Sequence, residues 1–172
     1  MLLITMKGPP GSGKSTLARA LSRQLGWPLI DKDDIKDIID GHASDPGRLA
    51  YDAMFNVARR QLRLGLSVIC DSPLTFNGLY QQAQQIANET GATLAVIECH
   101  CSNEQIWRER INSRQDLNLP AHHQTDWDAM QTYLSQVAGK ANYPIAEPYL
   151  VLDTVAPLDE LVKKAVAWLG SV

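Results

Sequence analysis

A glycine-rich segment near the N-terminus, residues 8–15, places the strongest constraint on how this chain folds. It reads GPPGSGKS, follows a short apolar run at residues 2–6 and precedes an amphipathic helix expected to begin near Lys14. A strand, a glycine loop and a helix in this order form a phosphate loop, because glycines let successive backbone N–H groups point inward at phosphate oxygens. The N-terminus of the helix adds a fixed positive field. The segment therefore predicts a nucleoside triphosphate site.

The residue types in the phosphate loop predict individual roles. Lys14 is expected to reach the β- and γ-phosphates, and the Ser15 hydroxyl is expected to bind Mg²⁺. The chain lacks the Asn-Lys-x-Asp sequence of guanine recognition, which favours ATP as the nucleotide. The nucleotide-binding residues predicted in this segment are Gly8, Gly11, Ser12, Gly13, Lys14, Ser15 and Thr16.

The composition narrows the class of protein. A chain of 172 residues is most simply one domain, and its net charge of −3 gives no overall attraction to nucleic acid or to an anionic membrane. No apolar run approaches the length needed to cross a bilayer. Cys99 and Cys101 are badly placed for a disulfide, so the three cysteines are expected to be buried thiols of a cytoplasmic protein. The chain is expected to be a monomer or a homodimer.

Strand-like and helix-like segments alternate along the whole chain. This order predicts an α/β phosphate-loop NTPase fold of three layers, a five-stranded parallel sheet between helices. Thr125 is expected to cap the helix that follows it, and residues 114–125 are expected to form a polar lid. The strands are expected at residues 2–6, 28–31, 66–70, 93–98 and 149–152. Ligands of such sheets bind beyond the carboxyl ends of the strands, where the phosphate loop also lies.

Three carboxylates, Asp31, Asp33 and Asp34, follow the second expected strand. Transfer of a phosphoryl group to a hydroxyl needs a carboxylate near the attacking oxygen, and Asp33 is the candidate, with Asp31 or Asp34 in support. An aspartate before Ile35 is also a good helix N-cap, so a structural role stays open. Lys36 lies one turn beyond Asp33 and is a candidate to hold an anionic substrate or to lie in solvent.

Asp71 ends the third expected strand. An acidic residue at this position in phosphate-loop proteins orients Mg²⁺, usually through water, so Asp71 is predicted to serve the metal and the substrate side. The alternative is a turn over residues 70–73 that the aspartate side chain fixes.

Two arginines precede the expected lid. Arg110 and Arg114 are four residues apart and share a helix face, which suits the charge that builds on a transferring phosphoryl group. An arginine pair at a helix C-terminus also suits the helix dipole without any ligand. His122 and His123 lie in the expected lid and point apart, so no metal site or catalytic role is expected of them.

Together these motifs resemble the small phosphate-loop kinases of the predicted-kinase (AAA-type ATP-binding) family, with a nucleoside-monophosphate-kinase-like fold similar to the kinase domain of phage polynucleotide kinase. The resemblance runs from the phosphate loop to the sequence LVLDT at residues 150–154. It implies that Asp33 acts on the acceptor hydroxyl and that Arg110 contacts the donor phosphates. Lys36 replaces an arginine of the polynucleotide kinase, and the two side chains grip phosphate differently.

The leading hypothesis is a kinase domain over residues 1–172 that uses ATP and Mg²⁺ to phosphorylate a hydroxyl of a metabolite, a nucleoside or an antibiotic-like compound. Lys14, Asp33 and Arg110 are its candidate catalytic residues. A polynucleotide 5′-hydroxyl kinase is the first alternative, although the acidic balance disfavours nucleic acid. A nucleotide-dependent switch or ATPase without an acceptor is the second. The sequence does not identify the acceptor.

Overall fold

The computed structural model describes residues 1–114 and 125–172 of the chain. Its centre is a five-stranded sheet in the order β2-β3-β1-β4-β5, and every neighbouring pair is parallel. The strands are β1 (Leu2–Lys7), β2 (Leu29–Asp31), β3 (Val68–Asp71), β4 (Thr93–His100) and β5 (Tyr149–Asp153). The α/β fold with a five-stranded parallel sheet, predicted from the alternation of elements, is confirmed.

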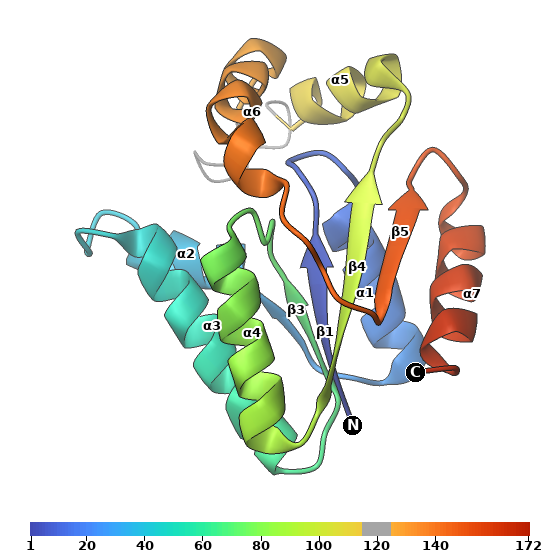
Figure 1. The fold of residues 1–172 in the computed structure, drawn as a ribbon. Coiled ribbons are helices and arrows are strands. Elements are labelled where there is room, and N and C mark those ends of the chain that lie inside the picture. The colour runs from blue at the N-terminus through green and yellow to red at the C-terminus, as the bar shows by residue number, and fades with distance from the viewer. Residues whose placement is uncertain (115–124) are drawn as a thin grey trace.

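Helices cover both faces of the sheet and the edge where its strands end (Figure 1). One face packs against α1 (Lys14–Leu25) and α7 (Leu158–Leu169). The other packs against α3 (Pro46–Arg63) and α4 (Asn77–Thr90). The remaining helices are α2 (Lys32–Ile39), α5 (Glu104–Asn112) and α6 (Trp127–Ala141), and α5 and α6 lie beyond the carboxyl ends of the strands.

The alternation of side chains along β1 divides the core into two clusters. Leu3 packs with α3 and α4, whereas Ile4 and Met6 pack with α1 and α7, because successive residues of a strand point to opposite faces. All three side chains are fully buried, as expected of a central strand covered by helices on both sides. This rigid centre holds the start of the phosphate loop.

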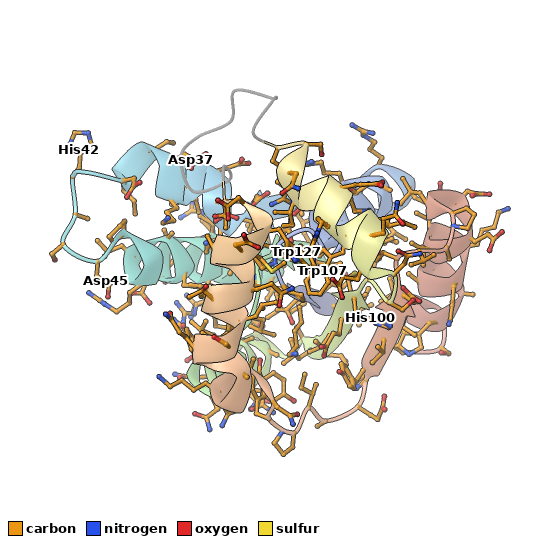
Figure 2. All side chains as sticks on the ribbon, turned by 90° about the horizontal axis from the view of Figure 1, so that it is seen from above. Asp37, His42, Asp45, His100, Trp107 and Trp127 are labelled. Atoms are coloured by element: carbon orange, nitrogen blue, oxygen red, sulfur yellow. The ribbon has the colours of Figure 1, made fainter. Side chains whose placement is uncertain are left out.

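A third, smaller hydrophobic cluster joins α5 to α6 beyond the carboxyl ends of the strands. Its centre is an edge-to-face pair of Trp107 and Trp127, with ring centroids 5.4 Å apart (Figure 2). Ile111 and Met130 are buried beside the pair. Aromatic pairs in this geometry stabilise beyond the area they bury, so α5 and α6 form one unit over the carboxyl ends of the strands.

Several expected boundaries differ from the structure. Thr125 was expected to cap α6, but the cap is Asp126, whose carboxylate accepts a hydrogen bond from the backbone N–H of Ala129 at 2.8 Å. The third strand begins at residue 68, two residues later than expected, and β4 continues to residue 100. The expected lid, apart from its two end residues, and the histidine pair at 122–123 lie outside the described residues.

The prediction of buried thiols is confirmed, because Cys70, Cys99 and Cys101 are all free and buried. Among the described residues, no helix combines the length and the apolar character that crossing a membrane requires.

Candidate active site

The phosphate loop leaves β1 and enters α1 through backbone conformations that glycine adopts without strain. Gly8 has φ +140°, and a Cβ added there would lie 2.3 Å from the carbonyl oxygen of Cys99. Gly11 has φ +74°, and its added Cβ would lie 2.7 Å from Cδ1 of Ile111. Such separations are shorter than any real contact of a Cβ, so the path of the loop depends on these glycines.

Lys14 is the first residue of α1, and only 7% of it is exposed. In residues 1–114 and 125–172, its ammonium group makes no ion pair or hydrogen bond. A buried cation is costly without a countercharge, and the N-terminus of a helix is itself positive, which raises that cost. The position of Lys14 is therefore suited to a bound anion.

Asp71 ends β3 and is 1% exposed. Both of its carboxylate oxygens lack a hydrogen-bond partner among the described residues. A turn fixed by the aspartate would show a backbone N–H bonded to that carboxylate, so the turn alternative finds no support here. Buried polar groups are normally paired, and an unpaired buried carboxylate at a strand end is suited to a hydrated Mg²⁺ ion.

The structure gives the three aspartates after β2 different surroundings. Asp31 is the N-cap of α2 and accepts a hydrogen bond from the backbone N–H of Asp33 at 2.9 Å. Burial, and then the nearby charge of Asp71, raise the pKa of Asp31 to about 6. Asp33 lies in the first turn of α2, so the capping role weighed for it belongs to Asp31. Asp34 is exposed and lines the cavity described below.

Lys32 was not among the expected site residues. It is 9% exposed, its ammonium group forms an ion pair with the Asp33 carboxylate, and it lies 5.7 Å from the centre of the Tyr51 ring. The candidate Lys36 is half-buried on α2 and does not line the cavity. A cation that pairs with Asp33 is thus its chain neighbour, and the sequence signal for it was a lysine directly after a short strand.

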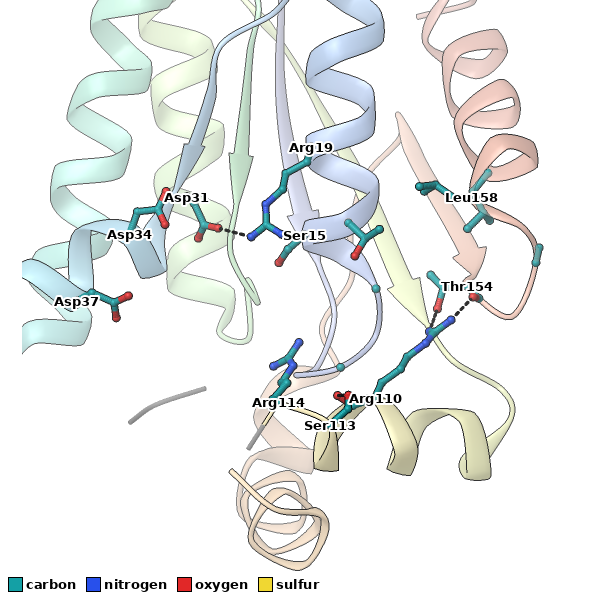
Figure 3. A pocket seen from close by; sticks show the side chains of 15 residues that line it. Ser15, Arg19, Asp31, Asp34, Asp37, Arg110, Ser113, Arg114, Thr154 and Leu158 are labelled. Atoms are coloured by element: carbon teal, nitrogen blue, oxygen red, sulfur yellow. Dashed lines mark hydrogen bonds and ion pairs between the residues drawn. The ribbon is translucent and has the colours of Figure 1, made fainter. Parts of the chain in front are cut away.

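A cavity of about 650 Å³ runs along the phosphate loop (Figure 3). The phosphate loop and α1 form its floor, the loop after β5 forms one end, and the first turns of α2 form the other. The end of α5 lies across from the floor (Figure 3). The lining residues are Gly11, Gly13, Ser15, Thr16, Arg19, Asp31, Asp34, Asp37, Arg110, Ser113, Arg114, Thr154, Ala156, Leu158 and Leu161.

Both predicted arginines face this cavity. Arg110 donates two hydrogen bonds to Thr154, one to its hydroxyl and one to its carbonyl oxygen, each at 2.8 Å. Arg114 is half-buried, and burial lowers its pKa while the charges of Asp33 and Asp71 act in the opposite direction. The arginine pair therefore lies inside the site rather than on a solvated helix end.

The indole of Trp107 ties α5 to the phosphate loop. Its Nε1–H donates a hydrogen bond of 2.7 Å to the carbonyl oxygen of Pro10. A Cβ on Gly11 would lie 3.0 Å from Cδ1 of the same indole. Trp107 thus contacts the loop at two successive residues, a contact that sequence spacing does not reveal.

This fold and site define the class of phosphate-loop, kinase-like nucleotide-binding domains. Within that class, the chain belongs to the family described as AAA domain, whose model matches residues 3–137. The predicted membership of an AAA-type, kinase-like family is therefore confirmed, and the likeness to phage polynucleotide kinase stays a prediction.

Known proteins resemble the chain in sequence and in fold. A cytidylate kinase of Pseudomonas putida is 44% identical over 45 residues, which are 26% of this chain and 20% of that protein. The chain thus spans about a fifth of that relative's length. A protein of Chloroflexus aurantiacus, provisionally called a kinase, has a crystal structure with a TM-score of 0.77 and 25% identity over 96% of this chain and 97% of that one. A gluconokinase of Sinorhizobium meliloti has a TM-score of 0.64 and 21% identity, over 98% and 91% of the two chains.

Proposed function

We propose that the chain is a phosphotransferase that moves the γ-phosphoryl group of ATP to a hydroxyl group of a small molecule. One observation carries the proposal: a buried lysine, Lys14, and a buried carboxylate, that of Asp71, both lack partners among the described residues. Asp71 ends β3, and Lys14 begins α1 after the phosphate loop that leaves the neighbouring strand β1 at the same edge of the sheet. A nucleotide with its Mg²⁺ ion supplies a countercharge to both groups at once.

The donor nucleotide fits the end of the cavity between α5 and the loop after β5. The phosphates would lie on the N–H groups of the phosphate loop, with Lys14 beside the β- and γ-phosphates. Ala156 and Leu158 give this end an apolar wall suited to a base. Arg110 is bonded to Thr154 at this end of the cavity, and its guanidinium group would contact the donor phosphates.

Mg²⁺ would be held by the hydroxyl of Ser15 and, through water, by Asp71. When bound, the ion neutralises charge on the β- and γ-phosphates during transfer. Ser15 lines the cavity, and the unpaired oxygens of Asp71 offer the hard, anionic ligands that this ion prefers.

On the acceptor side, Asp33 would position the attacking hydroxyl and take its proton. The neighbouring Lys32 pairs with the Asp33 carboxylate and restricts its orientation. As the phosphoryl group moves, Lys14, Arg110 and Arg114 would stabilise the negative charge that develops on its oxygens.

A small molecule suits this site better than a nucleic acid. Three carboxylates, those of Asp31, Asp34 and Asp37, line the end of the cavity opposite the base, and they would repel a polyanionic acceptor. The names of two similar proteins, a gluconokinase and a cytidylate kinase, also point to small acceptors.

The test is ADP release from Mg²⁺-ATP in the presence of nucleosides, sugar acids, aminoglycosides or 5′-hydroxyl oligonucleotides. We expect one small-molecule class to raise turnover by orders of magnitude and Asp33→Asn to abolish that rise. Asp40→Asn, an exposed aspartate at the other end of α2, is the matched control and should keep it. Slow hydrolysis that no acceptor stimulates and that Asp33→Asn leaves unchanged would refute the proposal in favour of an ATPase or switch.

A further inference from the structure

Thr154 is a buried hydroxyl residue at the point where β5 gives way to the loop before α7. It is 4% exposed, and its Oγ1 lies 2.8 Å from the carbonyl oxygen of Ser12 and 3.0 Å from that of His100. Its side chain also packs against the phosphate loop, because a Cβ added to Gly13 would lie 3.1 Å from Cβ of Thr154. One side chain thus contacts the phosphate loop and the end of β4.

Hydrogen bonds from Arg110 connect α5 to Thr154, which already contacts the phosphate loop and the end of β4. Arg110 donates from Nη1 to Oγ1 of Thr154 and from Nη2 to its carbonyl oxygen, both at 2.8 Å (Figure 3). A hydroxyl has one donor hydrogen and two lone pairs, so this oxygen can donate to a backbone carbonyl while it accepts from the guanidinium group. The arrangement fixes the planar guanidinium group at two atoms, which restricts both its position and its rotation.

The guanidinium group of Arg110 has more hydrogen-bond donors than its contacts with Thr154 use. A guanidinium group carries five N–H bonds, of which the two to Thr154 use two. Among residues 1–114 and 125–172 the remaining three have no partner, and Arg110 lines a cavity together with Gly11, Gly13 and Ser15. Because the same hydroxyl contacts the carbonyl of Ser12, the distance between Arg110 and the phosphate loop is set through Thr154.

We propose that Thr154 is a positioning residue, which holds the guanidinium group of Arg110 at a fixed place beside the phosphate loop so that it meets the donor phosphates without rearrangement. This inference rests on the proposed function, since it assigns a support to an arginine of that same site. Thr154 acts through Arg110, with the carbonyl of Ser12 in the loop as its anchor, and it needs no contact with the nucleotide itself. Preorganisation of this kind improves binding because the side chain is already ordered before the ligand arrives.

The test measures the affinity of the protein for the fluorescent nucleotide mant-ATP with Mg²⁺. Thr154→Val keeps the shape of the side chain and removes the hydroxyl, and we expect it to weaken binding about 10-fold. Thr154→Ser restores the hydroxyl and should bind within about twofold of the unaltered protein. The matched control is Thr90→Val, which removes a hydroxyl bonded to the backbone carbonyls of Ile86 and Ala87 in the last turn of α4. This control should leave the affinity unchanged.

A double-mutant cycle separates positioning from a general loss of structure. In an Arg110→Met background, Thr154→Val should weaken mant-ATP binding no further, because the group that it positions is gone. Independent, additive losses in the two variants would overturn the inference, as would a serine variant that binds no better than the valine variant. Urea unfolding of each variant shows whether a loss of affinity follows a loss of folding.

The same measurements distinguish failure of this inference from failure of the proposed function. If Arg110→Met weakens binding and Thr154→Val does not, only the role of Thr154 is refuted. If the unaltered protein shows no affinity for mant-ATP, the proposed function falls, and this inference falls with it.

Discussion

Asp31 offers a direct test of the electrostatics of the site. Its buried carboxylate lowers the stability of the fold when it is charged, and a single substitution removes that charge. Its side chain is 11% exposed, and burial followed by the charge of Asp71 raises its pKa from 3.8 to about 6. The folded protein therefore binds this proton more tightly than the unfolded chain does. The contribution of the group to stability is fully present below about pH 3.8 and is lost as the pH rises through about 6.

The size of the effect follows from those two pKa values. At about 1.36 kcal/mol per pH unit, the difference corresponds to about 3 kcal/mol, which solvent screening reduces to about 1–2 kcal/mol. Asparagine caps helices as well as aspartate does, so Asp31→Asn keeps the hydrogen bond to the N–H of Asp33 and removes the charge, together with a 3.9 Å ion pair to the exposed Arg19 that contributes little. We expect the variant to be more stable than the unaltered protein by about 1–2 kcal/mol at pH 8 and by about a third of that at pH 4.5.

Urea unfolding of the nucleotide-free protein between pH 4.5 and pH 8 measures this difference. Asp45→Asn is the matched control, because Asp45 caps α3 through the N–H of Arg48 at 3.0 Å but its side chain is 57% exposed. That control should show a small difference that does not grow with pH. A variant Asp31→Asn that is less stable at pH 8, or a difference that stays constant with pH, would refute the reasoning.

Three further predictions concern the phosphate loop and the proposed metal ligand Asp71. Gly8→Ala would place a Cβ 2.3 Å from a carbonyl oxygen near the end of β4 and should lower the free energy of unfolding by at least about 2 kcal/mol. The control Gly26→Ala, at φ +69° with no atom within 4 Å of the added Cβ, should lower it by about 1 kcal/mol. Equal losses in urea unfolding would contradict this prediction. Trp107→Phe should abolish any change in tryptophan fluorescence when ATP binds, and Trp168→Phe should preserve it. A fluorescence change that survives in Trp107→Phe would show that another tryptophan responds to the nucleotide. Asp71→Asn should raise the free energy of unfolding of the nucleotide-free protein by about 1–3 kcal/mol and weaken Mg²⁺-dependent nucleotide binding at least 10-fold, as urea unfolding and mant-ATP titration would show. A loss of stability in that variant would mean that the carboxylate has a structural partner.

Local sequence patterns predicted much of the fold. The phosphate loop lies between the expected strand and helix, and that helix, α1, begins at Lys14 as expected. Both depend on residues that are neighbours in sequence, since glycines set the loop and apolar spacing sets the helix. The cap of α6 was misplaced by one residue because Thr125 and Asp126 are both good N-caps, and local preference does not choose between them.

The positions of the candidate site residues were predictable where a strand end or a helix face fixes a side chain. Asp71 ends β3 next to Asp31 of β2, as expected of parallel strands, and Arg110 and Arg114 share the cavity, as their spacing indicated. Lys32 was missed because helical spacing drew attention to Lys36 as a candidate to hold an anionic substrate, whereas a lysine that pairs with Asp33 is the residue before it.

Contacts between distant parts of the chain were outside the reach of sequence patterns. Thr154 lies 142 residues from Ser12, whose carbonyl oxygen it contacts, and Trp107 lies 97 residues from Pro10. Neither pair has a spacing or motif that predicts it, because tertiary packing alone brings the partners together. These two contacts tie the loop after β5, and α5, to the phosphate loop.

The fate of the γ-phosphoryl group tests most directly whether the protein is a phosphotransferase with a small-molecule acceptor. The protein would be incubated with Mg²⁺ and γ-labelled ATP, together with the acceptor that gives the largest rise in ADP release. We predict that the label is recovered on a hydroxyl of the acceptor, in an amount equal to the ADP formed, and that Asp33→Asn abolishes this transfer. Recovery of the label as inorganic phosphate alone, with every acceptor tried, would contradict the assignment and make the protein an ATPase.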